Sequence, residues 1–464
     1  MGICRTTMLI LAGSWWVATA AFGQSVVLSD GGVAFSDSSM QSTAVFTGTA
    51  PLAKTGQTSC FDASGNLTAC GAGVGAGQEG HLQRGVNWPI PRFTKSGDGT
   101  VTDNMTGLIW LEDANCAGAT FIFDNALAFA NTLYDGSTAH GGGDCGLSDG
   151  SVAGDWRVPN IFEARSLMDH GYTGPGVPNT TGTGQWAEGD PFSDIQATYW
   201  TSTFNPQNKM FAHNALYSVP HLSSNWKTST FSVWPVRGPL DGSGPTQVTL
   251  VLADGGIEFP DGSVQTTSAS VKVVIPKTGQ QSCYNASGGS IACAGTGQDG
   301  DHQAGAAWPN PRFTINGDGT VSDNLTGLVW LEDADCNGLK SWASALSWAN
   351  GLYDGSIGSG GVNQDCGLSD GSLPGEWRVP TEAEFESLAY METDHPAIPN
   401  TAGTGQWAAG DPFIDIPAGN EYFWSSTTVA SSPDRACLVF PRSHATTNAV
   451  KSGTYHVWPV RDSR

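Results

Sequence analysis

Basic residues are scarce in this chain of 464 residues, in which 20 Lys and Arg face 43 Asp and Glu. The formal net charge of -23 opposes binding to nucleic acid and to anionic membranes, because both are negatively charged themselves. Charged residues of both signs make up only 14% of the sequence, too few for a charge-rich disordered polymer. The composition therefore favours a folded protein that does not bind nucleic acid.

Long apolar runs are missing beyond the start of the chain. Residues 8–21 are apolar, follow the basic Arg5 and end among small residues, which is typical of a secretory signal peptide cleaved after Gly23. No later run reaches the roughly 20 residues of a membrane-spanning helix. We therefore expect a signal peptide over residues 1–23 and no membrane insertion. The mature chain should be secreted, extracellular or displayed on the cell surface.

Two common metal motifs are also missing. The nine His residues include no His-Glu-x-x-His run, and no acidic stretch matches an EF-hand loop. We therefore expect no zinc site and no cofactor. A structural calcium ion is the exception to consider, with Asp144, Asp149, Asp365 and Asp370 as its candidate ligands. The alternative for these four carboxylates is a solvated position in a turn.

The chain does contain the same module twice. The stretch "TGQTSCFDASGNLTAC" from Thr55 returns as "TGQQSCYNASGGSIAC" from Thr278, and further matched motifs keep their order down to "VWPVR" at Arg237 and Arg461. Gly238–Thr246 has the Gly- and Pro-rich composition of a linker. We therefore expect each half to fold alone when the chain is cut there.

A hairpin signal precedes each repeat, as in the Pro-Asp-Gly turn of "GGIEFPDGSVQTT". The predicted boundaries are a hairpin lead-in at 24–52, a domain at 53–238, a linker with the second lead-in at 239–276, and a second domain at 277–464. An isolated hairpin cannot bury its apolar face alone. The lead-ins therefore offer a route to an oligomer.

Within each repeat the pattern predicts two helices and several short strands. The stretches "FDNALAFANTLYDG" and "SWASALSWANGLYDG" place apolar residues at helical spacing. After each Arg-Val-Pro, Asn160 with Glu163 and Thr381 with Glu384 have the spacing of a capping box, which starts the second helix. The remainder alternates between polar and apolar residues and predicts a small antiparallel sheet. Each repeat is thus expected to be an α+β domain.

Cysteines recur at equivalent positions in the two repeats. In an oxidising compartment they predict four disulfides within the repeats, Cys60–Cys70, Cys116–Cys145, Cys283–Cys293 and Cys336–Cys366. Cys4 lies in the expected signal peptide. Cys437 has no cysteine counterpart, since His213 occupies its place in the first repeat. We expect Cys437 to be a buried, inert thiol rather than a reactive one.

Several of these motifs together resemble a known family. "GDGTVTDN" or "GDGTVSDN", "CGLSDGS", "WRVP", "YWTST" or "FWSST", and "VWPVR" occur in the same order in both repeats and are similar to Lcl C-terminal-like domains. The resemblance covers roughly residues 91–237 and 311–461. It implies a C-type-lectin-like fold. Because the named family member belongs to a collagen-like bacterial adhesin, it also implies binding of glycans or extracellular matrix.

Two further resemblances suggest other functions. "WRVPTEAEFESL" is similar to a segment of formylglycine-generating enzymes, which share the broad C-type-lectin-like fold, so an exported enzyme is one alternative. The lead-in is similar to hairpin repeats of phage tail fibres and bacterial surface proteins, so a structural stalk or fibre component is another.

Apparent catalytic motifs lack their structural context. "GLSDG" places Ser148 and Ser369 at the spacing of a hydrolase nucleophile elbow, but Gly-rich sequence stands where a buried strand and a helix are needed. Arg157 and Arg378 stand at helix entrances, where an internal ion pair is the expected role. We therefore expect no enzyme activity.

The candidate binding site is a Gly-rich loop that displays a Trp, "GTGQWAEGDPF" at residues 182–192 and "GTGQWAAGDPF" at 403–413. A Trp beside amide and carboxylate groups suits sugar binding. The candidate ligand-binding residues are Gln185, Trp186, Asp190, Gln406, Trp407 and Asp411. The alternative is a long loop pinned by a buried Trp. We expect a surface protein that binds a glycan or an extracellular protein, with a neutral ligand favoured by the acidic charge.

Overall fold

The computed structural model describes most of the two repeats and parts of the lead-ins. The described residues are 27–29, 32–34, 40–41, 50–71, 73–138, 143–238, 251–253, 256–258, 264–265, 273–357, 365–417, 419, 421–441, 443 and 445–463. The expected signal peptide, and the expected linker after Gly238, lie outside these residues.

Each lead-in contains a small antiparallel sheet. The first sheet has the order β1 (Val27–Ser29), β2 (Gly32–Ala34), β3 (Met40–Gln41), and the second has the order β13 (Val251–Ala253), β14 (Gly256–Glu258), β15 (Val264–Gln265). In the first, Val27 pairs with Ala34, and in the second, Val251 pairs with Glu258. The lead-ins belong to a compact unit separate from residues 48–242 and 272–464, and oligomerisation through them stays a prediction.

The main part of the first repeat, here called module 1 (residues 87–238), contains two antiparallel sheets. One has the strand order β12-β8-β7-β6 and the other β11-β10-β9. Their bounds are β6 Phe93–Lys95, β7 Thr100–Asp103, β8 Ile109–Leu111, β12 Val236–Arg237, β9 Thr198–Phe204, β10 Phe211–Leu216 and β11 His221–Trp226.

Module 2 (residues 307–463) repeats this arrangement. Its sheets have the orders β18-β19-β20-β26 and β22-β23-β24, with the additional pair β21-β25. Their bounds are β18 Phe313–Ile315, β19 Thr320–Asp323, β20 Leu328–Leu331, β26 Val460–Asp462, β22 Phe423–Thr428, β23 Arg435–Phe440, β24 Ala445–Val450, β21 Lys340–Ser341 and β25 Thr454–Tyr455.

Both helices predicted for each repeat are present. They are α2 (Phe123–Thr132) and α3 (Ile161–Ser166) in module 1, and α5 (Trp342–Asn350) and α6 (Glu382–Glu386) in module 2. The capping boxes at the starts of α3 and α6 are confirmed. Each repeat also has a helix of one turn that the sequence did not predict, α1 (Glu79–Leu82) and α4 (Asp299–His302). No helix among the described residues is long and apolar enough to cross a bilayer.

Tryptophan dominates the cores of both modules. The fully buried side chains include Trp110, Trp156, Trp200 and Trp234 in module 1 and Trp330, Trp377, Trp424 and Trp458 in module 2. Edge-to-face contacts such as that between Trp110 and Trp234, with ring centroids 5.4 Å apart, add stability beyond the area that the rings bury.

A buried ion pair in each module joins the arginine of the Arg-Val-Pro motif to the helix that follows it. Arg157 donates two hydrogen bonds of 2.6 Å to the Glu163 carboxylate, and Arg378 makes the same bidentate pair with Glu384. The structural role expected for these two arginines is therefore confirmed.

The four expected disulfides are present, and Cys437 is a buried free thiol. Two of the disulfides close hairpins, one formed by β4 (Cys60–Phe61) with β5 (Leu67–Thr68), the other by β16 (Cys283–Tyr284) with β17 (Ser290–Ile291). The short 3-10 turn Gly73–Gly75 follows the first hairpin.

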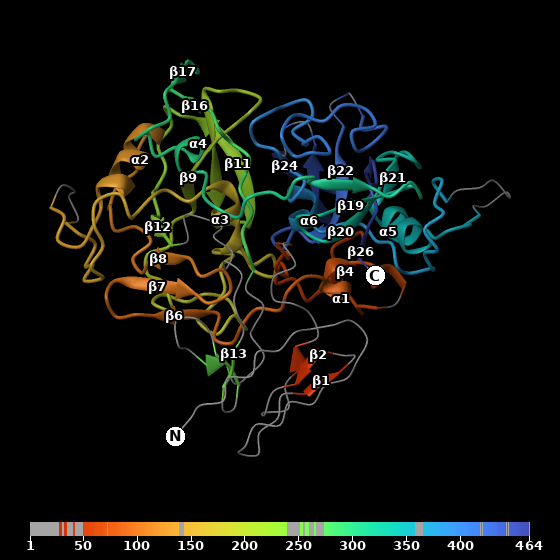
Figure 1. The fold of residues 1–464 in the computed structure, drawn as a ribbon, viewed down its shortest axis with the longest axis horizontal. Coiled ribbons are helices and arrows are strands. Elements are labelled where there is room, and N and C mark those ends of the chain that lie inside the picture. The colour runs from red at the N-terminus through yellow and green to blue at the C-terminus, as the bar shows by residue number, and fades with distance from the viewer. Residues whose placement is uncertain are drawn as a thin grey trace. The chain divides into compact units, whose positions relative to one another are not determined.

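The N-terminal segments of the repeats are exchanged in part: each still bonds to its own module, as in the His170 N–H to Thr55 carbonyl bond of 2.8 Å, but places its one-turn helix on the other module. Segment A (residues 50–86, with β4, β5 and α1) belongs to the first repeat in sequence, yet α1 packs on β22 of module 2. Segment B (residues 273–306, with β16, β17 and α4) belongs to the second repeat, yet α4 packs on β9 of module 1. In Figure 1 the orange β4 and α1 lie beside the blue elements of module 2, and the green β16 and α4 lie beside module 1.

Buried glutamines make the equivalent bonds in the two exchanged segments. The Gln57 amide donates to the Thr428 carbonyl over 2.7 Å and accepts from the Thr428 N–H over 2.9 Å. The Gln280 amide does the same with Phe204, at 2.7 and 3.1 Å.

Two buried acids and a lysine also form hydrogen bonds between each exchanged segment and the module of the other repeat. Glu79 accepts a hydrogen bond from Thr427 of module 2, and Asp299 accepts one of 2.7 Å from Thr203 of module 1. Lys227 of module 1 donates to the Tyr284 carbonyl in segment B over 2.6 Å. The sequence boundary after residue 238 therefore separates the repeats in sequence but not in packing, and residues 48–242 and 272–464 form one compact unit.

Candidate functional site in the tryptophan loops

The two Gly-rich loops that carry Trp186 and Trp407 (residues 182–192 and 403–413, here called the Trp loops) are held by short-range backbone hydrogen bonds. In module 1, isolated bridges join Pro178 to Gln185 and Ala187 to Asp190, and the Trp186 N–H donates to the Val177 carbonyl over 2.9 Å. Gly182 is required in this loop, because it has a φ of +76° and a Cβ there would lie 2.8 Å from the Cβ of Arg92. The bridges and the close approach fix the loop on the buried Arg92.

Several polar side-chain atoms of the loop form hydrogen bonds within module 1. The Gln185 amide donates to the Thr173 and Pro175 carbonyls over 2.7 and 3.0 Å, and the Asp190 carboxylate accepts from the Thr180 N–H over 3.0 Å. The Trp186 indole N–H donates to the Phe192 carbonyl over 2.9 Å. Gln185 and Asp190 are exposed, whereas Trp186 is half-buried against the core.

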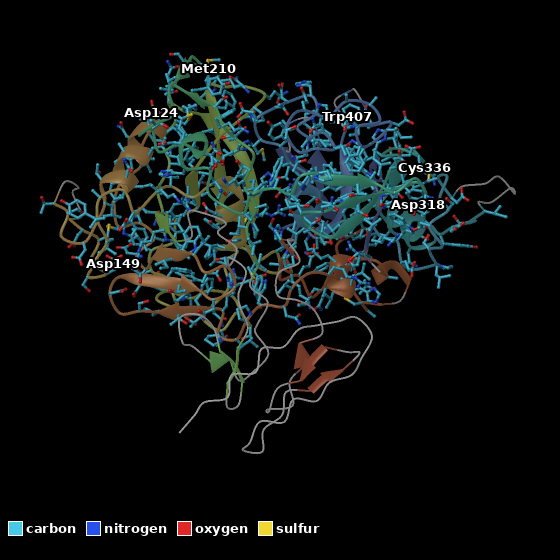
Figure 2. The ribbon with its side chains drawn as sticks, in the orientation of Figure 1. Asp124, Asp149, Met210, Asp318, Cys336 and Trp407 are labelled. Atoms are coloured by element: carbon cyan, nitrogen blue, oxygen red, sulfur yellow. A yellow bond between two sulfur atoms is a disulfide. The ribbon has the colours of Figure 1, made fainter. Side chains whose placement is uncertain are left out.

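Module 2 reproduces these contacts residue for residue. The Gln406 amide donates to the Asp394 and Pro396 carbonyls, the Trp407 indole donates to the Phe413 carbonyl over 2.9 Å, and Asp411 accepts from the Thr401 N–H over 2.8 Å. Gln406 is exposed, and Trp407 and Asp411 are half-buried. Figure 2 labels Trp407 among the loops of module 2.

The surroundings of the two loops differ in polarity. The Lys95 ammonium lies 3.4 Å from the Gly189 carbonyl of the first loop and pairs with Glu112 at 2.7 Å. The position of Lys95 is taken by Ile315 in module 2, which is 42% exposed, and Glu188 of the first loop is replaced by Ala409. The second loop in turn has Asp394 in contact with Gln406, where module 1 has the neutral Thr173, so the two loops have different charged neighbours.

Neither alternative drawn from the sequence describes these loops completely. The Trp residues do pack against the core, as the structural alternative expects, but each is only half-buried and stands beside an exposed glutamine. Because each indole N–H is bonded inside the protein, a ligand could contact only the ring of this side chain. The face of an aromatic ring can stack on the CH groups of a sugar or on an apolar side chain.

The comparisons with known proteins agree with the repeats. The model of the family described as the Lcl C-terminal domain matches residues 99–237 and again residues 319–461, more than half of the chain. The chain belongs to this family. No curated protein and no solved structure matches it. Neither matched range includes segment A or segment B, so the exchanged segments lie outside the two Lcl C-terminal domains.

The carboxylates considered for calcium in these Lcl C-terminal domains bond to turns and arginines. Asp144 accepts from the Gly146 N–H over 3.1 Å, and its equivalent Asp365 accepts from the Gly367 N–H over 3.1 Å. No group of three or more acidic, His or Cys side chains among the described residues has an arrangement that could hold a metal ion.

Asp149 and Asp370 make contacts that match between the two modules. Each accepts a hydrogen bond of 2.6 Å from a serine two residues on. Each also pairs with an arginine of the last strand at 3.1 Å, Arg237 or Arg461. Figure 2 labels Asp149 in module 1. These carboxylates therefore hold a turn to a strand.

The serines of the "GLSDG" motifs, which the sequence predicts to be turn residues, lie in irregular chain just after a turn. The Ser148 N–H donates to the Asp98 carbonyl, and the Ser369 N–H to the Asp318 carbonyl, each over 3.0 Å. The next helix begins only at Ile161 in module 1. A nucleophile elbow needs a helix directly after the serine, so these segments lack the elbow geometry.

Cys437 lies on β23 of the second Lcl C-terminal domain, beside the interface with module 1. Burial raises the pKa of its thiol well above the ordinary value, and the nearby Glu382 carboxylate adds to this rise. The thiolate is the reactive form of cysteine, so this environment keeps Cys437 unreactive.

One exposed aromatic pair was missed in the sequence. Trp226 at the end of β11 is 48% exposed, and its ring centroid lies 4.5 Å from that of Phe211 on β10. Val450 and Arg435 occupy the equivalent positions in module 2. Because Trp226 is present in one Lcl C-terminal domain alone, the motifs that match between the repeats did not point to it.

Proposed function

We propose that this chain is a secreted or cell-surface bacterial protein that binds a glycan or an extracellular protein through the Trp loops of its two Lcl C-terminal domains, without catalysis. The observation that carries the proposal is the shared geometry of the loops. Each presents a half-buried Trp beside an exposed glutamine, and the indole N–H is bonded to a backbone carbonyl of the loop.

The proposed fold of each domain is C-type-lectin-like. In its support, each module combines two helices and small antiparallel sheets with a disulfide that joins two loops. Four disulfides in the described residues also fit an exported protein, because such bonds persist in oxidising compartments.

Two loops in one compact unit support binding to a repetitive ligand. A ligand that reaches both loops binds the second in an effectively intramolecular step, which raises the overall affinity without new contacts. The net charge of -23 favours a neutral glycan or a protein over a sulfated polysaccharide. The unequal surroundings of Trp186 and Trp407 lead us to expect unequal affinities of the two loops.

The test is a glycan and matrix-protein array with residues 24–464, with and without chelator, followed by loop variants. Trp186→Ala and Trp407→Ala should each weaken binding by about 1–3 kcal/mol, and the double variant should lose more than either. Trp226→Ala is the matched control, because it removes an exposed Trp outside the loops. Binding that survives the double variant, or that falls equally with Trp226→Ala, would contradict the assignment of the site.

Melting curves of the same variants separate ligand contact from packing. Truncation of the fully buried Trp234 should cost about 3–5 kcal/mol of stability, whereas the half-buried Trp186 should cost clearly less. If Trp186→Ala destabilised the protein as much as Trp234→Ala, loss of binding could be assigned to unfolding and the loop would be only structural.

A further inference from the structure

Equivalent residues of the two modules meet face to face. Arg165 on α3 and Glu386 on α6 occupy the same position in their repeats and form an ion pair with each other. The Thr446 hydroxyl donates to the carbonyl of its equivalent, Leu222, over 3.2 Å. Contacts between equivalent residues are the mark of a two-fold interface. The modules are therefore related by an approximate two-fold axis that passes between α3 and α6.

The exchange of segments obeys the same symmetry. Val273 of segment B donates to the Met105 carbonyl of module 1, and its equivalent Ala50 of segment A donates to the Leu325 carbonyl of module 2. Lys227 and Lys451, which are equivalent, donate to the carbonyls of Tyr284 and Phe61 in the exchanged hairpins. The single chain thus has the architecture of a dimer whose subunits have exchanged their N-terminal segments.

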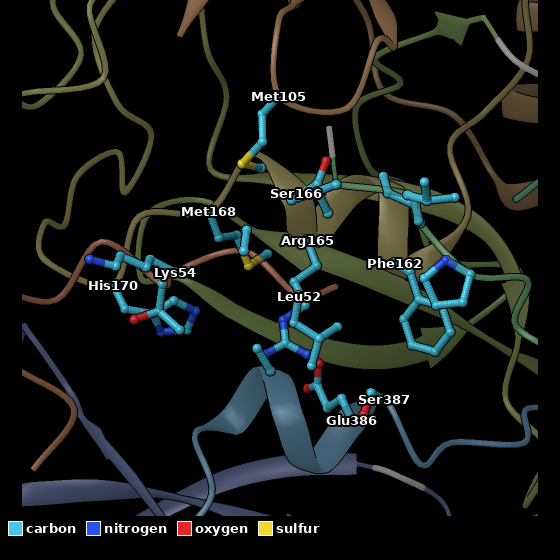
Figure 3. A pocket seen from close by; sticks show the side chains of 17 residues that line it. Leu52, Lys54, Met105, Phe162, Arg165, Ser166, Met168, His170, Glu386 and Ser387 are labelled. Carbon is cyan, nitrogen blue, oxygen red and sulfur yellow. The ribbon is translucent and has the colours of Figure 1, made fainter. Parts of the chain in front are cut away.

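At the axis itself the two modules are complementary rather than identical. Positive Arg165 faces negative Glu386, and their side chains are 12% and 1% exposed. One turn earlier on each helix, Phe162 of α3 and Ala383 of α6 line the same cavity, so a large ring in one module corresponds to a methyl group in the other. Figure 3 shows Arg165 extending toward Glu386, with Phe162 at the side of this cavity.

Pairing of two identical modules would lose this complementarity. Two copies of module 1 would place Arg165 against Arg165 and Phe162 against Phe162. Two copies of module 2 would place Glu386 against Glu386, with the buried Glu382 close by on the same helix. A buried charge without an opposite partner is strongly unfavourable, and two bulky rings would compete for the same space.

We infer that each repeat is a specific binding partner for the other repeat, that the two stay assembled without the covalent linker, and that the axis residues select this mixed pair over a pair of like repeats. The partner surface comprises the axis face of one module together with its groove for the exchanged segment. The same surface would accept the complementary repeat from a second copy of the chain.

The experiment starts from the full chain with a protease site placed in the expected linker, between Gly238 and Thr246, and cut after folding. The nicked protein should elute as one species with the mass of the uncut chain. After denaturation with its disulfides intact and joint refolding, the fragments should reassemble in a 1:1 ratio. Separation of the fragments under native conditions, or recovery of like pairs as often as mixed pairs, would overturn the inference.

Variants at the axis test its role in selection. Glu386→Arg should weaken reassociation of the nicked fragments at least about 100-fold, because it buries two positive charges against each other. Arg165→Met with Glu386→Met should keep the mixed pair, since apolar side chains of similar size replace a buried ion pair at little cost, but should admit more like pairs. Unchanged selectivity in this folded double variant would show that the ion pair does not select the partner.

Discussion

A single buried amide offers the sharpest test of the exchanged architecture. The Gln280 side chain in segment B is 1% exposed and bonds to both backbone groups of Phe204 in module 1 and to the Met391 carbonyl in module 2, at 2.7, 3.1 and 2.9 Å. Gln280→Ala would leave three buried backbone groups without this partner. At about 1–3 kcal/mol for each group, with some relief by relaxation, we expect a loss of roughly 3–6 kcal/mol in the free energy of unfolding.

The assay is equilibrium unfolding in urea with the disulfides intact. Gln280→Glu keeps the volume but replaces the two donated bonds with a carboxylate oxygen facing two carbonyls, so it should be destabilising without creating a cavity. Gln281→Ala changes the exposed neighbour and should alter stability by less than about 0.5 kcal/mol. Losses below about 1 kcal/mol for both Gln280 variants would refute the reasoning, because buried groups would not depend on the amide.

Two further predictions concern the interface between the modules. Burial raises the pKa of Glu79 from 4.5 to about 8, so the folded state retains this proton while the unfolded state releases it, and stability is lost as pH rises between these values. Glu79→Gln cannot ionise, and its stability relative to the parent protein should therefore rise from pH 4.5 to 8 and then level off; a difference that is constant with pH would contradict the buried neutral acid. Cys437 should resist alkylation in the native protein and react on unfolding, as measured by mass spectrometry; rapid native labelling would show that its burial is wrong.

The features that could be predicted from the sequence are the local ones. The capping box of Thr381 and Glu384 needs only residues three apart, and the Cys60–Cys70 hairpin closes over ten residues, so each pattern contains all the partners of the interaction. Both are confirmed. The Trp loops were found for the same reason, although their half-buried rings depend on packing that the local sequence does not specify.

The exchange could not be predicted because the repeats are so alike. Gln57 and Thr428 are 371 residues apart in the chain, and Gln280 bonds to the equivalent backbone of the other module. A segment that fits the groove of one repeat fits the groove of its relative nearly as well. The sequence pattern is therefore the same whether each segment packs on its own module or on the other one. Only the contacts between the modules distinguish the two arrangements.

The exchange also determines when the protein can finish folding. Segment A leaves the ribosome early, but its docking strand β22 is made roughly 350 residues later, which at about 5–20 residues per second is a delay of roughly 20–70 s. During that time the equivalent groove on β9 of module 1 is already present and is reserved for segment B. Premature docking of Gln57 and Glu79 there would have to be reversed before segment B could bind. Holding the chain unfolded until it is complete would avoid that competition.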